Sequence, residues 1–351
     1  YDYLPSIGAG EYDPNTNILV DIFAASLKRL NKDITDLQIK QEIDYIRRIL
    51  DNDDLGREFY QKLTATTGIK YIDFEHASNN VWHCATEFTC ENQETKDNFR
   101  PDVTCFINGL PIAFIEVKIP NNHDGILAER DRMNRRMSNR RFRRFLNLTQ
   151  LMIFSNNQEY DNENRVPIQG AFYASITKED IFFNVFREQK SSFYEHLHLK
   201  GIDDEEEKRI LKAFNLVVLK SLPEYSTNIQ PNTPTNRVLS SLLCRDRILF
   251  LLRYGFAYVD VKAKNDKGEE IYKLEKHVMR YQQLFASLAI RRKLDQNIRS
   301  GIIWHTQGSG KTALAYYSVK SLTDYYAAKS IVAKFYFIVD RLNLMEQAQI
   351  E

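Results

Sequence analysis

Three ionisable residues lie where the sequence otherwise predicts buried strands. Asp102 precedes a short apolar run, and Glu116 and Lys118 end a second run, two residues apart and therefore on one face of an extended strand. Ionised groups are costly among buried strands unless they bind something. A metal ion and a phosphate group are suitable ligands for two carboxylates and an ammonium group. These three residues are therefore our first candidates for a catalytic site.

The turn between the two runs decides whether the carboxylates can meet. Asn108-Gly109 favours the positive φ angles of a tight hairpin turn. A two-residue turn there would pair Asp102 with Ile115 and turn Asp102 and Glu116 to opposite faces, which excludes a shared metal ion. A three-residue loop would pair Asp102 with Glu116 instead. We therefore predict the longer loop or an equivalent bulge.

Helices and strands alternate around this hairpin, which predicts an α/β chain. The spacing of apolar residues predicts helices within 17–64 and 178–220, and strands within 70–90, at 151–154 and at 171–174. Thr35 and Gln38 fit a capping box at one helix start. A Pro-rich polar stretch, 223–236, is not expected to continue a helix and is interpreted as a linker between two domains, 1–222 and 237–351.

An arginine-rich stretch follows the hairpin. Residues 126–146 hold eight arginines, of which four share one helical face at four-residue spacing: Arg132, Arg136, Arg140 and Arg144. A solvated face is the ordinary interpretation of such a charge run. Beside a hairpin that could cleave phosphodiester bonds, we instead favour contact with the DNA backbone, because guanidinium groups suit phosphate oxygens. An internal acidic surface is the second candidate.

A second candidate site lies in the predicted second domain. A helix at 238–252 and strands at 256–261 and 270–273 lead to a helix beginning at Tyr281, and then to an apolar strand at 301–305, a Gly-rich turn, another helix and a buried strand at 335–339. In the turn, the N–H groups of Gly308, Ser309 and Gly310 would face phosphates. Lys311 would reach the β and γ oxygens of a nucleotide, and Thr312 would hold Mg²⁺.

Composition limits the possible partners and compartments. The chain has 351 residues, and its 48 basic and 47 acidic residues nearly cancel, so any affinity for nucleic acid must come from local patches. The four cysteines have neither disulfide-like nor zinc-like spacing, which favours reduced thiols and a cytoplasmic location. No signal peptide and no apolar run near 18 residues long is present, so no membrane span is expected. The abrupt ends, Tyr1 and Glu351, lead us to expect a fragment.

The hairpin and the phosphate loop together resemble the R (motor and nuclease) subunit of type I restriction-modification enzymes, over essentially the whole chain. Members of this family carry a PD-(D/E)xK nuclease, matched here by Pro101, Asp102, Glu116 and Lys118. They also carry superfamily 2 helicase motifs. The segment 304–312 resembles motif I in its family-specific form, which includes His305 at the first glycine position of the strict pattern.

Two further segments resemble helicase motifs. Residues 280–283 resemble the adenine-reading Q motif, with Gln283 as the reader, and Val339-Asp340-Arg341 with Gln347 resembles motif Ia. The resemblance implies a PD-(D/E)xK restriction-endonuclease-like domain, a mixed sheet flanked by helices, at 1–222. It also implies the first part of a RecA-like helicase domain at 237–351, which ends before a Walker B motif.

The implied activity is that of an ATP-dependent endonuclease and DNA translocase. Asp102 and Glu116, with the carbonyl of Val117, would bind one or two Mg²⁺ ions, and Lys118 would orient or activate the attacking water. The implied cofactors are Mg²⁺ and ATP, and the implied partners are double-stranded DNA and the methyltransferase (M) and specificity (S) subunits. Family members often carry a Gln-x-x-x-Tyr motif where Arg132 and Arg136 stand here.

Two other functions fit the same residues. One is a different nuclease-helicase, active in repair or in another type of restriction system. The other is a DNA-binding ATPase in which a vestigial nuclease serves as a docking module. The sequence does not specify the DNA target, because in the resembled family a separate subunit chooses it.

Overall fold

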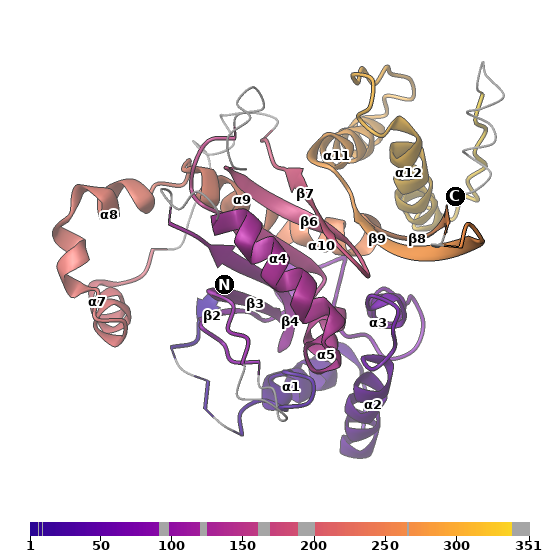
Figure 1. The fold of residues 1–351 in the computed structure, drawn as a ribbon. Helices are drawn as coiled ribbons and strands as arrows, with labels where there is room; N and C mark the ends of the chain where they lie inside the picture. Colours follow the sequence, from indigo (N-terminus) through magenta and orange to yellow (C-terminus); the bar gives the residue numbers. More distant parts are fainter. Residues whose placement is uncertain are drawn as a thin grey trace. The chain divides into compact units, whose positions relative to one another are not determined.

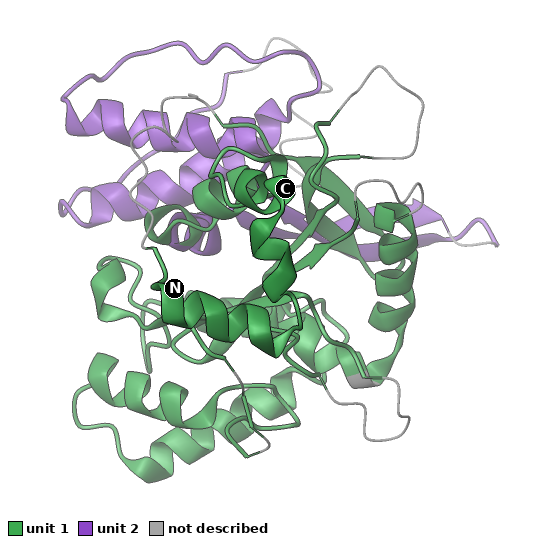
Figure 2. Cartoon of the chain, turned by 90° about the vertical axis from the view of Figure 1, so that its left-hand side faces the viewer, with its two compact units in different colours: residues 1–248 green, residues 249–351 purple. Residues whose placement is uncertain are grey.

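The computed structural model describes residues 1–351 except 6, 9, 91–97, 120–124, 161–168, 189–200, 265–266 and 339–351. Its architecture is mixed α/β, as predicted, and it divides into two compact units, Tyr1–Ile248 and Leu249–Glu351 (Figure 2). The division falls beyond the stretch that we interpreted as a linker, 223–236. The domain bounds given above therefore stay a prediction.

A mixed sheet forms the centre of the first unit (Figure 1). Its strands are β1 (Asp2–Tyr3), β2 (Trp82–Thr86), β3 (Val103–Ile107), β4 (Leu110–Val117), β5 (Leu151–Ser155), β6 (Ala171–Thr177) and β7 (Ile181–Val185). Strands β1 to β6 pair in sequence order, and β7 pairs with β6. The β1–β2 and β4–β5 pairs are parallel and the others antiparallel. The parallel β4–β5 step requires a crossover, and helices α4 and α5 provide it.

The helices of the first unit precede, cross and follow this sheet. They are α1 (Val20–Leu30), α2 (Asp36–Ile49), α3 (Arg57–Leu63), α4 (Gly125–Ser138), α5 (Arg140–Leu148), α7 (Asp204–Ala213), α8 (Pro223–Asn228) and α9 (Pro234–Leu242), with 3-10 turns η1 (Ala77–Asn79) and η2 (Val217–Ser221). The predicted helices within 17–64 are confirmed. The capping box is confirmed too, because Thr35 Oγ1 accepts from the Gln38 amide at 3.2 Å and Gln38 Oε1 accepts from the Thr35 amide at 2.9 Å.

Aromatic side chains from three elements make the core between the sheet and its crossover helices. Phe114 of β4, Phe145 of α5 and Phe154 of β5 are all buried. The ring centroids of Phe114 and Phe145 lie 6.0 Å apart, and those of Phe114 and Phe154 lie 6.1 Å apart. Burying each ring contributes on the order of 2–3 kcal/mol. This packing fixes the crossover helices on the face of β4 to which Phe114 points.

The β3–β4 hairpin contains a bulge, which is one of the two ways in which we predicted that its strands would pair. Its turn contains only Asn108 and Gly109, because Ile107 pairs with Leu110, so the longer loop is not formed. The pairing shifts by one residue beyond Phe106, and Val103 therefore lies opposite Ile115. The ladder ends at this pair. The same register extended by one residue sets Asp102 opposite Glu116, and the Asp102 carboxylate reaches across to the amide of Val117 at 2.6 Å. The alternative that we predicted, an equivalent bulge, is confirmed.

The hairpin turn is anchored inside the protein. Asn108 is fully buried, and its side-chain amide donates to the carbonyl of Tyr71 at 2.9 Å and to Asn80 Oδ1 at 2.8 Å. The carbonyl of Gly109 accepts from the amide of Leu19 at 2.9 Å, directly before α1 begins. Both turn residues have positive φ, 53° and 82°, which Asn and Gly tolerate best. The turn is therefore held against α1 as well as within the sheet.

Several predicted elements differ in the first unit. The expected strand at 70–75 is a series of turns, because the Asp73 carboxylate accepts from the amides of Glu75 and His76, each at 2.9 Å. Strand β7 lies within the range predicted as helical, where the aromatic and β-branched run IFFNV favours a strand. The 223–236 stretch holds α8 and the start of α9, because proline is well accommodated in the first turn of a helix.

The second unit holds α10 (Arg245–Tyr254, which begins in the first unit), β8 (Phe256–Lys264), β9 (Glu270–Val278), α11 (Tyr281–Asp295) and α12 (Lys311–Ala327). The two strands predicted at 256–261 and 270–273 are present as the longer β8 and β9, and the helix beginning at Tyr281 is confirmed. The single helix expected at 238–252 is divided into α9 and α10. The strand predicted at 301–305 is not formed, and neither is the described part, 335–338, of the second one. Ile302 and Ile338 are 91% and 97% exposed, because neither segment has a paired strand within the described residues.

Over the residues that the structure describes, no helix is both long enough and apolar enough to cross a lipid bilayer.

Replacing Gly109 by alanine should lower the free energy of unfolding by about 2–4 kcal/mol. A Cβ atom there would lie 2.7 Å from the carbonyl oxygen of Leu19 and 2.9 Å from the amide nitrogen of Phe23, both main-chain atoms. Gly68→Ala is the matched control, because Gly68 also has a φ of 82° but has nothing within 4 Å of a Cβ atom. Urea unfolding of both variants measures the difference. Equal losses would contradict the tight packing of the turn against α1.

Candidate functional site

The bulged hairpin brings the three predicted residues together. Lys118 Nζ lies 3.0 Å from Glu116 Oε2 and 4.0 Å from Asp102 Oδ2. Asp102 is held across the hairpin because its Oδ2 accepts from the main-chain amide of Val117 at 2.6 Å. The period of two along a strand places Glu116 on the same face of β4 as Phe114, under the crossover helices. Glu116 is accordingly only 4% exposed.

A fourth charged residue, Glu129 of α4, completes the cluster, and the sequence analysis missed it. Its Oε2 lies 3.4 Å from Lys118 Nζ, and the residue is 1% exposed. A signal was present, because an acidic residue within the arginine-rich stretch stands three and seven residues before Arg132 and Arg136, on one helical face. The proximity to Lys118 depends on how α4 packs over β4, which spacing along one helix does not reveal.

Two arginine side chains of α4 donate hydrogen bonds to this carboxylate. Arg132 Nη1 donates to Glu129 Oε2 at 2.6 Å, and Arg136 Nη1 donates to Glu129 Oε1 at 3.0 Å. The guanidinium of Arg136 also lies 4.1 Å from the centroid of the Phe99 ring, a cation–π contact. The two α4 arginines among the four predicted to contact DNA therefore have an acidic partner within the chain.

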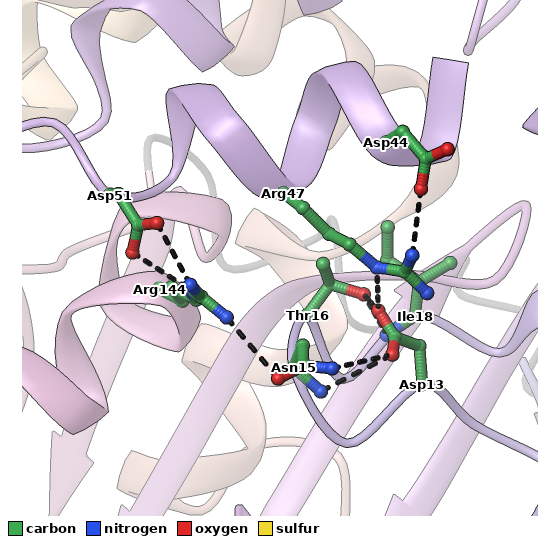
Figure 3. A network of polar contacts seen from close by, with 8 residues as sticks. All are labelled: Asp13, Asn15, Thr16, Ile18, Asp44, Arg47, Asp51 and Arg144. Carbon is green, nitrogen blue, oxygen red and sulfur yellow. Dashed lines mark hydrogen bonds and ion pairs between the residues drawn. The ribbon is translucent and has the colours of Figure 1, made fainter. Parts of the chain in front are cut away.

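The two predicted arginines of α5 differ from each other. Arg144 forms a bidentate pair with Asp51, at 2.7 and 2.8 Å, and its Nη1 donates to Asn15 at 3.3 Å (Figure 3). Arg140 is exposed at the start of the helix. The second candidate named above, an internal acidic surface, thus accounts for three of the four arginines. Contact of these residues with DNA stays a prediction.

Burial and neighbouring charges shift the pKa values of Glu116 and Lys118. Burial, together with the nearby charge of Glu129, raises the pKa of Glu116 to about 7, although Lys118 acts in the opposite direction. Burial lowers the pKa of Lys118, but the charges of Glu116 and Glu129 outweigh this effect and raise that pKa above its ordinary value. A carboxylate that is half protonated near neutral pH is one that an additional cation would stabilise in its ionised form.

The oxygen atoms at this site suit a hard divalent cation. Among the described residues, no group of three or more His, Cys, Asp and Glu side chains could hold a metal ion. The donor set predicted from sequence is smaller, and it stays a prediction. It consists of Asp102 and Glu116, which reach the same ammonium group, with the carbonyl of Val117. Carboxylate and carbonyl oxygens are donors that fit Mg²⁺, and both carboxylates lie within 4.0 Å of Lys118 Nζ; Mg²⁺ binding itself stays a prediction.

The phosphate loop of the second unit has its turn and its helix but lacks its strand. Gly308 and Gly310 have φ angles of 78° and 76°, and α12 begins at Lys311, directly before Thr312. Ser309 Oγ donates to the carbonyl of Thr306 at 2.8 Å, which closes the turn. The Lys311 ammonium donates to the carbonyls of His305 and Thr306 at 3.0 and 2.9 Å. The basic side chain that we expect to meet phosphate is thus folded back onto the loop.

Gln283, the predicted adenine reader, connects the start of α11 to this loop. It is 3% exposed, and its Nε2 donates to the carbonyl of Gly310 at 2.8 Å while its Oε1 accepts from the Arg280 amide at 2.7 Å. Arg280 also donates from Nη1 to the carbonyl of Gly308 at 3.0 Å. Recognition of adenine by Gln283 stays a prediction. The motif Ia residues, 339–341 and 347, lie outside the described residues.

Two family models and three curated proteins match parts of the chain. Residues 1–162 match the family described as type I restriction enzyme R protein N terminus, and residues 276–351 match the family described as type III restriction enzyme, res subunit. Three similar proteins come from Methanocaldococcus jannaschii and are provisionally named as type I restriction enzyme endonuclease subunits.

Two of these relatives match most of the chain. MjaVIIP is 24% identical over 84% of the chain and 23% of its own length, and MjaIXP is 24% identical over 94% of the chain and 30% of its own length. MjaVIIIP is 36% identical over 26% of the chain. The chain thus spans less than a third of the length of the first two relatives. Residues 1–162 are thus similar to the N terminus of type I restriction enzyme R proteins, and residues 276–351 are similar to the type III restriction enzyme res subunit.

Proposed function

We propose that this chain supplies the nuclease and the first part of the motor of a type I restriction system. In the whole protein, hydrolysis of phosphodiester bonds in unmodified double-stranded DNA would be coupled to ATP-driven translocation. The observation that carries the nuclease proposal is the bulge that sets Asp102 opposite Glu116, with Lys118 beside both carboxylates. Two carboxylates and a lysine on one hairpin match the PD-(D/E)xK pattern, and we propose that fold for the first domain.

Each residue of the hairpin has a defined task in this proposal. Asp102 and Glu116, with the carbonyl of Val117, would hold one or two Mg²⁺ ions. Bound Mg²⁺ supplies positive charge that activates water and stabilises the transition state. Lys118 would orient the attacking water and add a positive charge beside the phosphate. The hydrogen bond that the Val117 amide donates keeps the Asp102 carboxylate directed across the hairpin, which limits the reorganisation that catalysis would require.

The phosphate loop would bind ATP. The N–H groups at 308–310 and the start of α12 would receive the phosphates, and Thr312 would hold Mg²⁺. Lys311 would exchange the carbonyls of His305 and Thr306 for phosphate oxygens, since those two bonds are main-chain contacts that an anion can replace. We propose that Gln283 orders the loop through Gly310 and also reads adenine.

The remaining proposals concern partners and an alternative role. We propose a cytoplasmic protein that acts on double-stranded DNA together with methyltransferase and specificity subunits. A vestigial nuclease used for docking is the second candidate, and one observation favours it. Three acidic side chains are ion-paired with three basic ones, so the charges of the cluster balance without a metal ion. They are Asp102, Glu116 and Glu129, and Lys118, Arg132 and Arg136.

Replacing Asp102 or Lys118 by alanine should reduce Mg²⁺-dependent nicking of supercoiled DNA by at least about 10²–10⁴-fold. The assay uses the intact protein assembled with methyltransferase and specificity subunits and supplied with ATP. Asp131→Asn is the matched control, because Asp131 is an exposed carboxylate on α4 that pairs with its neighbour Arg130. Equal nicking rates for the wild type and both alanine variants would contradict the catalytic role and favour the vestigial nuclease.

Stability without divalent cations should fall as pH rises. Because the pKa of Glu116 is about 7 in the folded protein against an ordinary value of 4.5, the folded state retains a proton that the unfolded state releases between these values. The stabilisation is complete below about pH 4.5 and is lost through pH 7, an upper bound of about 3 kcal/mol.

Thermal unfolding in EDTA at pH 5.5 and pH 8 measures this loss, which Glu116→Gln should reduce. Ca²⁺ at millimolar concentration should raise the melting temperature of the wild type at pH 8 and leave that of Glu116→Gln unchanged. A Ca²⁺ effect of equal size in both proteins would argue against metal binding at Glu116.

Lys311→Ala should weaken ATP binding by at least about tenfold, because the variant loses the only lysine within the loop 305–312. Fluorescence titration with a labelled ATP analogue measures the affinity, and Lys334→Ala, an exposed lysine outside the loop, is the control. If the two variants bound the ATP analogue with the same affinity, Lys311 would not be part of the ATP site.

A further inference from the structure

The ammonium group of Lys118 lies between the carboxylates of the hairpin and one carboxylate of α4. On the hairpin side it meets Glu116 at 3.0 Å, and on the α4 side it meets Glu129 at 3.4 Å. Glu129 is almost completely buried, whereas the Lys118 side chain is 23% exposed. A buried carboxylate is costly unless its charge is compensated, so the position of Glu129 beside Lys118 requires a reason.

Both oxygens of Glu129 are already held by arginines of the same helix. Oε2 accepts from Arg132 and Oε1 from Arg136, at 2.6 and 3.0 Å. Arg136 is fixed in turn by the Phe99 ring and by Met133 Sδ, which lies 3.2 Å from its Nη1. Turning Glu129 toward a metal ion would break two charge-assisted hydrogen bonds, each worth about 1.5–3 kcal/mol. Glu129 is therefore poorly placed to become a metal ligand.

We propose that Glu129 is a positioning residue for Lys118. Asp102 and Glu116 would hold a divalent cation, and its positive charge would disfavour the present position of the Lys118 ammonium group, 3.0 Å from Glu116 Oε2. Glu129, whose Oε2 lies 3.4 Å from Lys118 Nζ, is the carboxylate that would retain the ammonium group on the α4 side. Arg132 and Arg136 hold the direction of that carboxylate, so the position of Lys118 is set by α4 as well as by its own strand.

This inference rests on the proposed nuclease function and deepens it. A purely structural salt-bridge cluster would need the charge of Glu129 only to balance the two arginines. A positioning role needs that charge for Lys118 as well. Removing Glu129 alone, and removing it together with one arginine, separates the two roles, because the second change restores the balance of charge without restoring the partner of Lys118.

The test compares Glu129→Gln, Arg132→Gln and the double variant Glu129→Gln/Arg132→Gln in the intact protein within its complex. Glutamine keeps the shape of the side chain and removes its charge. Three quantities are measured: the single-turnover nicking rate at saturating Mg²⁺, the Mg²⁺ concentration for half the maximal rate, and the melting temperature. Asp131→Asn on the same helix is the control, since its carboxylate is largely exposed.

Glu129→Gln should lower the saturated rate by about 10²-fold and change the half-maximal Mg²⁺ concentration by less than about twofold. The double variant should regain the melting temperature of Arg132→Gln but remain about 10²-fold slower than that single variant. A rate that recovers together with the melting temperature would reduce Glu129 to a structural role. A large rise in the Mg²⁺ requirement would instead identify Glu129 as a metal ligand, which also overturns the proposal.

The proposed function and this inference fail in different ways. If the wild type does not cut DNA and neither Lys118→Ala nor Glu129→Gln differs from it, the nuclease function fails and takes the inference with it. If the wild type cuts and Lys118→Ala does not, but Glu129→Gln cuts at the wild-type rate, only the positioning role is wrong.

Discussion

The candidate site depends on one extra residue in strand β4. The two-residue turn at Asn108 and Gly109 alone would set Asp102 and Glu116 on opposite faces of the hairpin, and the bulge beyond Phe106 cancels that offset. The turn cannot shift to remove the bulge, because Asn108 is hydrogen-bonded inside the protein and Gly109 lies against the start of α1. The register that joins the two carboxylates is therefore fixed by contacts on the far side of the hairpin.

The same strand connects the hydrophobic core to the charged cluster. Phe114 and Glu116 point to one face of β4, and the crossover helices that bury the first also bury the second. Burial raises the pKa of Glu116, and α4 supplies Glu129 to the other side of Lys118. The packing of the crossover helices therefore also sets the charges around Lys118. A change that moves α4 over the sheet should affect the surroundings of Lys118 without touching the hairpin.

Local signals in the sequence predict the hairpin well, and tertiary contacts explain what they miss. Strand period and the Asn-Gly turn locate Asp102, Glu116 and Lys118, and the requirement for a shared face predicts the bulge. Glu129 was not predicted, because its contact with Lys118 arises only when α4 packs on the sheet. The apolar segments 301–305 and 335–338 show the opposite error, because a run of apolar residues indicates burial whereas a strand also needs a paired neighbour.

The central claim is that Asp102 and Glu116 form one metal site beside Lys118. Crystals of the intact protein soaked in Mn²⁺, measured at the manganese absorption edge, test it most directly. The account predicts an anomalous peak within about 2.5 Å of an oxygen of each carboxylate, with Lys118 Nζ turned toward Glu129. No peak between the two carboxylates, with Lys118 still in contact with Glu116, would contradict it.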